Sequence, residues 1–271
     1  MLTDRFPIAK AIAGRLNAER EGLSDQWRNA SPIRHFFLDD LLPVQEVRAL
    51  AESFPDPRTL LLRSTLRERK RVGVDVSRFA PIVGEYLFAF QEPPVIQAIS
   101  HITGMRGLEA DPTLYASGVS LMGKGDFLHP HLDNSHDGDR KRYRVLNILF
   151  YASPDWKLEN GGNLELWYPT IRKAKIVWSR FNRLVVMETH QANWHSVSKV
   201  LVDQPRCCIS NYYFSSTSPT GKDYLQVTTF TGRPEEPLTR LLLRLDGILR
   251  NGIRQALPGL RRKTKHRLPA A

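Results

Sequence analysis

The sequence is poor in cysteine and contains no long apolar run. Its two cysteines, Cys207 and Cys208, are adjacent, so they cannot form an unstrained bridge or a disulfide framework. No stretch approaches the roughly 18 apolar residues that a membrane-spanning helix needs. The first residues carry charges and a proline where a secretory signal requires an apolar segment. These absences lead us to expect a cytoplasmic protein in a reducing compartment.

Acidic residues are scarce at the C-terminal end. The chain has 39 Lys and Arg against 28 Asp and Glu, a net charge of +11. From Arg240 onward, nine basic residues face one acid, Asp246, so this tail carries +8 and leaves +3 for residues 1–239. Most of the chain is therefore close to neutral, and its charge gives no reason to expect nucleic acid as a partner.

Hydrophobic periodicity changes along the chain. It predicts helix over residues 3–29 and a strand at 32–38. Asp39 and Asp40 are expected to cap a helix that runs to residue 54, with Pro43 in its first turn. The charged segment 59–79 predicts a mobile or partner-facing loop, and helix follows over 80–105 with a break at Pro93. From 113 to 230, period-two alternation between turn signals predicts an antiparallel β-sandwich or barrel.

Residues 238–257 return to helical periodicity, with leucines on one face and arginines largely outside it. We favour packing of that face, including Leu241, Leu245 and Leu249, against the rest of the chain or against a second subunit in a homo-oligomer. The alternative is that residues 238–267 bind an anionic membrane surface or an acidic partner.

Three residues have the types and spacing of a metal site. On a strand, His131 and Asp133 point to the same face, because side chains alternate. His195 lies 62 residues beyond Asp133 on a later strand and is the best candidate for a third ligand. Two histidines and one carboxylate on one face of an octahedral ion leave three positions open, the pattern of non-haem Fe(II) oxygenases.

An arginine follows this set. Alternation places Arg206, Ser210 and Tyr212 on one face of a strand, and an arginine that faces an apolar interior needs an anion. Its planar fork suits a carboxylate, to which Ser210 and Tyr151, from a preceding strand, can also donate. The alternative is an ordinary ion pair between Arg206 and Asp203.

Two other functions compete with an iron enzyme. In the first, His129 and His131 chelate zinc with His136 or a cysteine, although structural zinc sites take four ligands at short spacing. In the second, the chain is a cupin-like binding module without catalysis. Intact Asp133, His195 and Arg206 speak against that module.

The combined motif resembles a known family. The order is His-x-Asp at 131–133, a Gly-Gly turn before a Leu-x-Leu strand at 161–166, His-x-Val at 195–197, and then Arg206. It is similar to the Fe(II)- and 2-oxoglutarate-dependent dioxygenases, and within them to the prolyl 4-hydroxylase-like subgroup, over about residues 33–232. The implied fold is α+β: a double-stranded β-helix (a cupin-like jelly roll) with N-terminal supporting helices and a C-terminal amphipathic helix.

This resemblance also implies roles and boundaries. It implies Fe(II) on His131, Asp133 and His195, and 2-oxoglutarate on Arg206, Tyr151 and Ser210, with O2 as the oxidant and ascorbate as a reductant. The expected reaction hydroxylates a C–H bond of a peptide residue or small metabolite and releases succinate and CO2. We expect a helical support region at 1–110, the catalytic core at 111–232 and a basic helix and tail at 233–271, together one compact domain.

Substrate recognition is assigned on weaker grounds. Four residues near the motif are candidates for contacts with the substrate or with the metal ligands: His129, Asn134, Trp194 and Arg142. We expect the charged segments 63–72 and 136–144 to border the pocket mouth and to favour an acidic or phosphorylated substrate. The sequence departs from the family at 120–122, where Ser-Leu-Met stands in the region that often supplies a tyrosine for 2-oxoglutarate.

Overall fold

The computed structural model describes residues 4–243 and 245–246. Two helices replace the single helix expected at 3–29: α1 (Arg5–Ala18) and α2 (Arg20–Asn29). Asp4 caps α1 by accepting from the backbone of Phe6 at 3.1 Å. The chain leaves helical geometry at Glu19, where φ and ψ are −102° and 12°, and this break separates the two.

Prolines mark the starts of the next helices. Helix α3 (Val44–Glu52) begins after Pro43, and no side chain caps it. The expectation that Asp39 and Asp40 cap it was wrong, because Asp39 instead accepts from Arg183 at 2.5 and 2.8 Å. Helices α4 (Pro81–Ala89) and α5 (Pro93–Thr103) each carry proline in the first turn, which confirms the break within 80–105.

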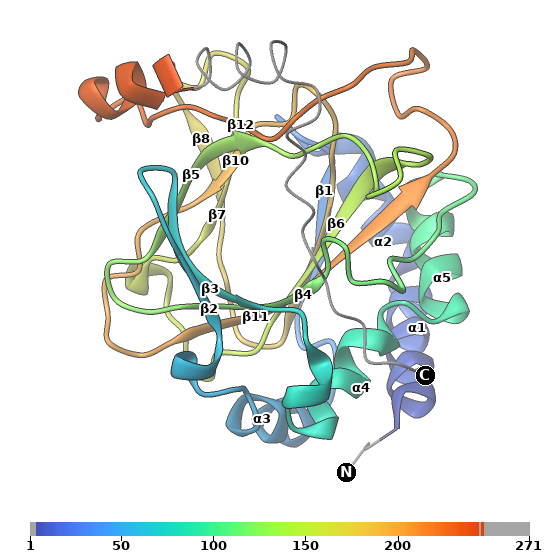
Figure 1. Cartoon of the computed structure of the whole chain (residues 1–271). Coiled ribbons are helices and arrows are strands. Elements are labelled where there is room, and N and C mark those ends of the chain that lie inside the picture. Colours follow the sequence, from blue (N-terminus) through green and yellow to red (C-terminus); the bar gives the residue numbers. More distant parts are fainter. Residues whose placement is uncertain (1–3, 244, 247–271) are drawn as a thin grey trace.

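Twelve strands form one curled antiparallel sheet (Figure 1). The order is β1-β9-β6-β11-β4-β3-β5-β10-β7-β8, with β2 beside β3 and β12 beside β5. This architecture confirms the predicted jelly roll. The strands are β1 (His35–Leu38), β2 (Leu61–Ser64), β3 (Glu68–Gly73), β4 (Gly118–Met122), β5 (Phe127–Leu132), β6 (Tyr143–Tyr151), β7 (Leu164–Trp167), β8 (Ala174–Val177), β9 (Arg183–Glu188), β10 (His195–Val197), β11 (Arg206–Ser215) and β12 (Thr229–Phe230).

The charged segment 59–79 is a hairpin in this sheet, not the loop that its composition predicted. Strand β2 pairs with β3, and β3 pairs with both β4 and β5, so the hairpin bridges two parts of the curled sheet. Arg69 and Arg71 point to the buried carboxylate of Asp126, at 3.0 and 3.6 Å. This shared acid neutralises part of the charge that favoured a loop.

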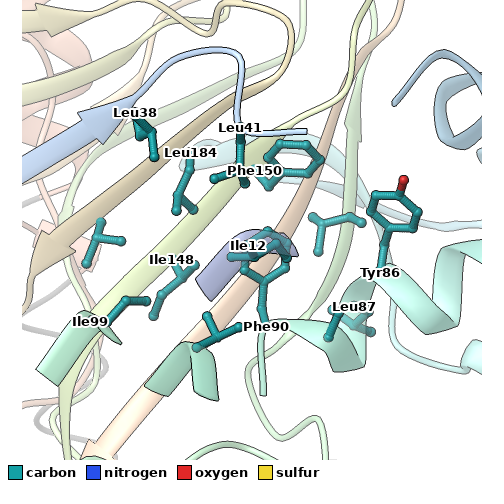
Figure 2. Close-up of a cluster of buried hydrophobic side chains, with 14 of the residues drawn as sticks. Ile12, Leu38, Leu41, Tyr86, Leu87, Phe90, Ile99, Ile148, Phe150 and Leu184 are labelled. Carbon is teal, nitrogen blue, oxygen red and sulfur yellow. The ribbon is translucent and has the colours of Figure 1, made fainter. Parts of the chain in front are cut away.

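The helices cover the outer face of the sheet and bury a large apolar core there (Figures 1 and 2). The ring of Phe150 on β6 lies 5.5 Å from that of Phe90 and 6.5 Å from that of Tyr86. Ile12 and Ile99 bring α1 and α5 to the same cluster. Burial of each such side chain stabilises the fold by about 1.5–3 kcal/mol, so this layer holds the sheet in place behind the site.

The segment after β12 contains a helix that starts at residue 237. Leu243 is buried, but Leu241 and Leu245 are 55% and 54% exposed. The expectation that these two pack against the rest of the chain was therefore wrong, and Leu249 lies outside the described residues. Within the described part, no helix is long and apolar enough to cross a bilayer.

Candidate metal centre and anion pocket

Three of the predicted ligands meet inside the curled sheet. One donor atom each from His131, Asp133 and His195 lies within 4.8 Å of the others. Asp133 Oδ1 is 3.6 Å from His131 Nε2, and its Oδ2 is 3.6 Å from His195 Nε2. Strand pairing explains this arrangement, because β5 and β10 place His131 directly opposite His195. The donor set and its size suit a divalent ion with open positions.

Both imidazoles are oriented by backbone carbonyls. Nδ1 of His131 lies 3.0 Å from the carbonyl oxygen of His129, and Nδ1 of His195 lies 3.0 Å from that of Asn193. These contacts leave each Nε2 directed to the centre of the group, as metal-binding histidines require. Burial, followed by the neighbouring His195, lowers the pKa of His131 to about 3. The ring is therefore neutral near pH 7, the state that ligates a metal.

Arg144 and Asn147, both on β6, hold the carboxylate of Asp133. Arg144 Nη1 lies 3.4 Å from Oδ1, and Asn147 Nδ2 donates to Oδ2 at 3.0 Å. Burial alone would raise the pKa of Asp133, but Arg144, then the two histidines and the Asn147 hydrogen bond, hold it below its usual range. The sequence motifs single out neither Arg144 nor Asn147.

A second group surrounds Arg206. The guanidinium is 3% exposed, donates from Nε to Ser179 Oγ at 3.2 Å, and lies 4.9 Å from the ring of Tyr151. Among the described residues, no carboxylate pairs with it. The alternative ion pair fails, because Asp203 is exposed and contacts Lys124 at 3.1 Å.

This second group suits an anion. A buried guanidinium without a counter-charge is costly unless a ligand supplies one. The Tyr151 hydroxyl is buried beside Arg206 and Ser179, and burial raises its pKa to about 12. Gly162 lies so close that a Cβ there would be 2.7 Å from Arg206 Cδ. Ser210, also predicted here, has its Oγ 3.7 Å from Cys208 Sγ. Met122, from the departing 120–122 segment, has its Sδ 3.8 Å from Arg206 Nη1.

Two aromatic rings line the metal group. Phe230, on β12, stacks on His131 with ring centroids 5.2 Å apart and planes 19° apart. Tyr212, on β11, lies under Arg144, whose guanidinium carbon is 4.3 Å from the ring centroid. No sequence pattern selects Phe230, since β12 is only two residues long.

The four weaker candidates lie in different surroundings. His129 Nε2 lies 3.6 Å from Glu236, because a register shift between β5 and β10 interrupts the alternation expected from His131. Asn134 donates to the carbonyl of His136 at 2.6 Å. Arg142 pairs with two acids: Asp137 at 2.8 Å and Glu109 at 2.9 Å. Trp194 is half-buried beside His195. Their roles in substrate binding stay predictions.

Zinc is not favoured. Within the described ranges, the group of His131, Asp133 and His195 is the one set of potential ligands that could hold a metal ion. His136 instead contacts the Ser135 hydroxyl at 2.7 Å. Burial raises the pKa of Cys207 to about 12 and also raises that of Cys208, which opposes the thiolate form that binds metal.

Comparison with known proteins agrees with this geometry. Residues 117–214 match the family model of the 2OG-Fe(II) oxygenase superfamily. This range contains all three candidate metal ligands, Arg206 and Tyr151, and the match confirms the resemblance seen in the sequence. No curated protein matched the chain.

Solved structures of prolyl hydroxylases share the fold. A Pseudomonas putida prolyl-4-hydroxylase is 20% identical with a TM-score of 0.50, covering 71% of this chain and 98% of its own. A Trichoplax adhaerens prolyl hydroxylase in complex with a hypoxia inducible factor peptide is also 20% identical, with a TM-score of 0.51 and coverages of 73% and 92%. A prolyl 4-hydroxylase from Phytophthora capsici is 17% identical, with a TM-score of 0.54 and coverages of 90% and 75%.

Proposed function

We propose that this chain, a 2-oxoglutarate- and Fe(II)-dependent dioxygenase whose residues 117–214 belong to that superfamily, binds iron through His131, Asp133 and His195. Arg206, with Tyr151 and Ser210, binds the distal carboxylate of 2-oxoglutarate. The observation that carries this proposal is the pairing of two incomplete groups in one interior. One is a His-Asp-His set of metal size. The other is Arg206, which is buried and has no carboxylate partner among the described residues.

The residues of the chain prepare the reaction in distinct ways. Bound iron with 2-oxoglutarate and O2 supplies the oxidising chemistry, which releases succinate and CO2 and hydroxylates a C–H bond of the substrate. His131 and His195 would present their Nε2 atoms to the metal, and the carbonyls of His129 and Asn193 fix their rings. Arg144 and Asn147 keep Asp133 ionised and oriented. Arg206 determines where the cosubstrate lies, since its fork fits a carboxylate.

The substrate is a peptide residue or a small metabolite. The Trichoplax adhaerens relative holds a peptide in its structure, which supports a peptide here. Both cysteines are free and buried, which supports the cytoplasm as the location. Ascorbate as a reductant, and contact of residues 238–267 with a membrane, an acidic partner or a second subunit, belong to the same proposal. So do the boundaries 1–110, 111–232 and 233–271.

The test combines cosubstrate binding with turnover. Anaerobic addition of Fe(II) and 2-oxoglutarate should produce the visible charge-transfer absorption of a chelated Fe(II) complex. Addition of air should then release succinate. His131→Ala should lose both signals, while the matched control His101→Ala, an exposed histidine of α5, should keep both. Succinate release by His131→Ala at the rate of the unaltered chain would overturn the proposal.

A further inference from the structure

Arg144 has more hydrogen-bonding capacity than the chain uses. Its side chain is 5% exposed, and the Nε atom is buried without a partner. The guanidinium contacts Asp133 at 3.4 Å and stacks on Tyr212, but within the described chain its N–H groups donate no hydrogen bond. A buried arginine that leaves donors unused is costly, so such a group points to an anionic ligand.

The β2–β3 hairpin adds positive charge from the opposite side. Arg63 and Lys70 are directly paired across the hairpin, so they share one face. Both approach one acid, Glu68, at 4.0 and 3.1 Å. Arg69 and Arg71 alternate to the other face and contact Asp126.

The face with Arg63 and Lys70 is turned toward the site. Val72, two residues from Lys70 on the same face of β3, pairs with Ser120, and Ser120 pairs with Cys208 on the inner face of β11. Arg63 pairs directly with Lys70 and therefore shares this inward face. The two cations of the hairpin and Arg144 therefore surround the same interior space.

Bound iron and cosubstrate do not neutralise these three cations. The two positive charges of Fe(II) and the two negative charges of 2-oxoglutarate cancel in the sum, so the net charge of the interior is that of its side chains. Among the described residues named here, four cations (Arg206, Arg144, Lys70 and Arg63) then face two acids, Asp133 and Glu68. The side chains around the interior therefore keep a net positive charge when iron and 2-oxoglutarate are both bound.

We propose that the primary substrate carries a carboxylate, which Arg144 binds beside the metal group while Arg63 and Lys70 attract it from the hairpin. This inference rests on the proposed function, since it assigns a substrate class to the same site. A carboxylate fits because the planar guanidinium binds its two oxygens in parallel. Arg142 takes no part, because Asp137 and Glu109 already neutralise it.

The experiment uses matched probes that differ in one charge. The full chain with Fe(II) and 2-oxoglutarate is kept anaerobic, and the change in its visible absorption is recorded as each probe is added. One arm compares N-acetyl amino acids with the corresponding amides, and a second compares peptides containing Asp or Glu with peptides containing Asn or Gln. The first arm responds to a small acid and the second to an acidic peptide. Either source supports the proposal when acids bind more tightly.

Three variants measure how much each of the three cations contributes to the preference for acids. Acids should bind about tenfold to a hundredfold more tightly than amides, the range for a hydrogen bond to a charged group. Arg144→Gln should remove most of that preference, while Arg63→Gln and Lys70→Gln should each reduce it severalfold. The matched control is Arg28→Gln, an exposed arginine of α2. If Arg144→Gln does not fold or does not bind iron, the two hairpin variants test the proposal.

The outcomes distinguish this inference from the proposed function. Equal responses to acids and amides, or no response to either pool, would overturn the carboxylate proposal. Unchanged acid preference in Arg63→Gln and Lys70→Gln would overturn the part assigned to the hairpin. Failure of the proposed function looks different, because the absorption would then be absent before any probe is added.

Discussion

Strands β6 and β11 carry apolar side chains on one face and polar or charged side chains on the other. The face toward the helices carries apolar and aromatic side chains that form the main core: Ile148, Phe150, Ile209 and Tyr213. The face toward the interior carries polar and charged side chains that surround the candidate site: Asn147, Tyr151, Arg206 and Tyr212. The same backbone therefore supports two environments separated by one strand thickness.

The comparison separates stability from ligand binding. Apolar burial on the outer face stabilises the fold. Polar groups on the inner face lower stability when they lack a partner among the described residues, as for the Nε atom of Arg144. Substitutions on the outer face should therefore reduce stability first, and substitutions on the inner face should reduce ligand binding first.

The largest effect is expected from Asp133→Asn, which removes one metal ligand but keeps its shape. Loss of groups that only orient ligands costs about 10- to 100-fold in metal affinity, so loss of a ligand should cost more than about a hundredfold. Succinate release should fall below detection, and the midpoint of thermal unfolding should fall as well, because Arg144 would be left without the carboxylate that it contacts. Iron titration and calorimetry measure both quantities. Unchanged iron affinity in this variant would show that Asp133 is not a metal ligand.

Phe150→Ala tests the outer face. Removing this ring should lower the free energy of unfolding by about 3–5 kcal/mol, because a cavity forms beside Phe90 and Tyr86. Urea unfolding gives the loss. At a low temperature where the variant is folded, its affinity for iron and 2-oxoglutarate should match that of the unaltered chain. A large loss of affinity would show that the two faces are coupled.

Arg206→Gln, on the inner face, should lower ligand affinity without lowering stability. The affinity for 2-oxoglutarate should fall about 10- to 100-fold, since one charged hydrogen-bonding group contributes about 1.5–3 kcal/mol. The free energy of unfolding of the ligand-free protein should not fall, because the variant no longer buries a guanidinium without a carboxylate partner. Cosubstrate titration and urea unfolding give the two values. Unchanged cosubstrate affinity would contradict the assignment of Arg206.

Alternation along the strands made much of the site predictable. It placed His131 with Asp133, and Arg206 with Tyr212, and the distant His195 followed from the ligand types that iron needs. These inferences need only the period of two, which regular strands keep. Sequence reasoning also located the change from helices to sheet near residue 113, because turn residues separate short alternating runs there.

Irregular backbone explains what sequence reasoning missed. Between β6 and β11 the register shifts, so that Leu146 pairs with Tyr213 but Arg144 pairs with Phe214. The extra residue turns Arg144 to the inner face, where strict alternation would not place it. A similar shift between β5 and β10 separates His129 from His131. The hydrophobic pattern of the sequence does not reveal a single added residue in a strand. It also does not reveal that β3 pairs with two strands.

The smallest expected effect concerns His129, a buried polar residue that is not one of the candidate metal ligands. Burial first, and then Arg233 and Lys199, lower its pKa to about 4, although Glu236 lies 3.6 Å away. The unfolded chain therefore takes up this proton first, near the ordinary histidine pKa of about 6.5. The stability contributed by neutral His129 is present above that pH and is lost as the pH falls toward 4.

Replacing His129 by Gln should remove this part of the acid sensitivity. Between pH 7 and pH 5, the unaltered chain should lose about 1–2 kcal/mol more of its free energy of unfolding than His129→Gln loses. Urea unfolding of both proteins at each pH, in metal-free buffer, measures the difference. Equal losses would mean that His129 titrates alike in the folded and unfolded chains. The burial of this ring against the segment after β12 would then be looser than the structure shows.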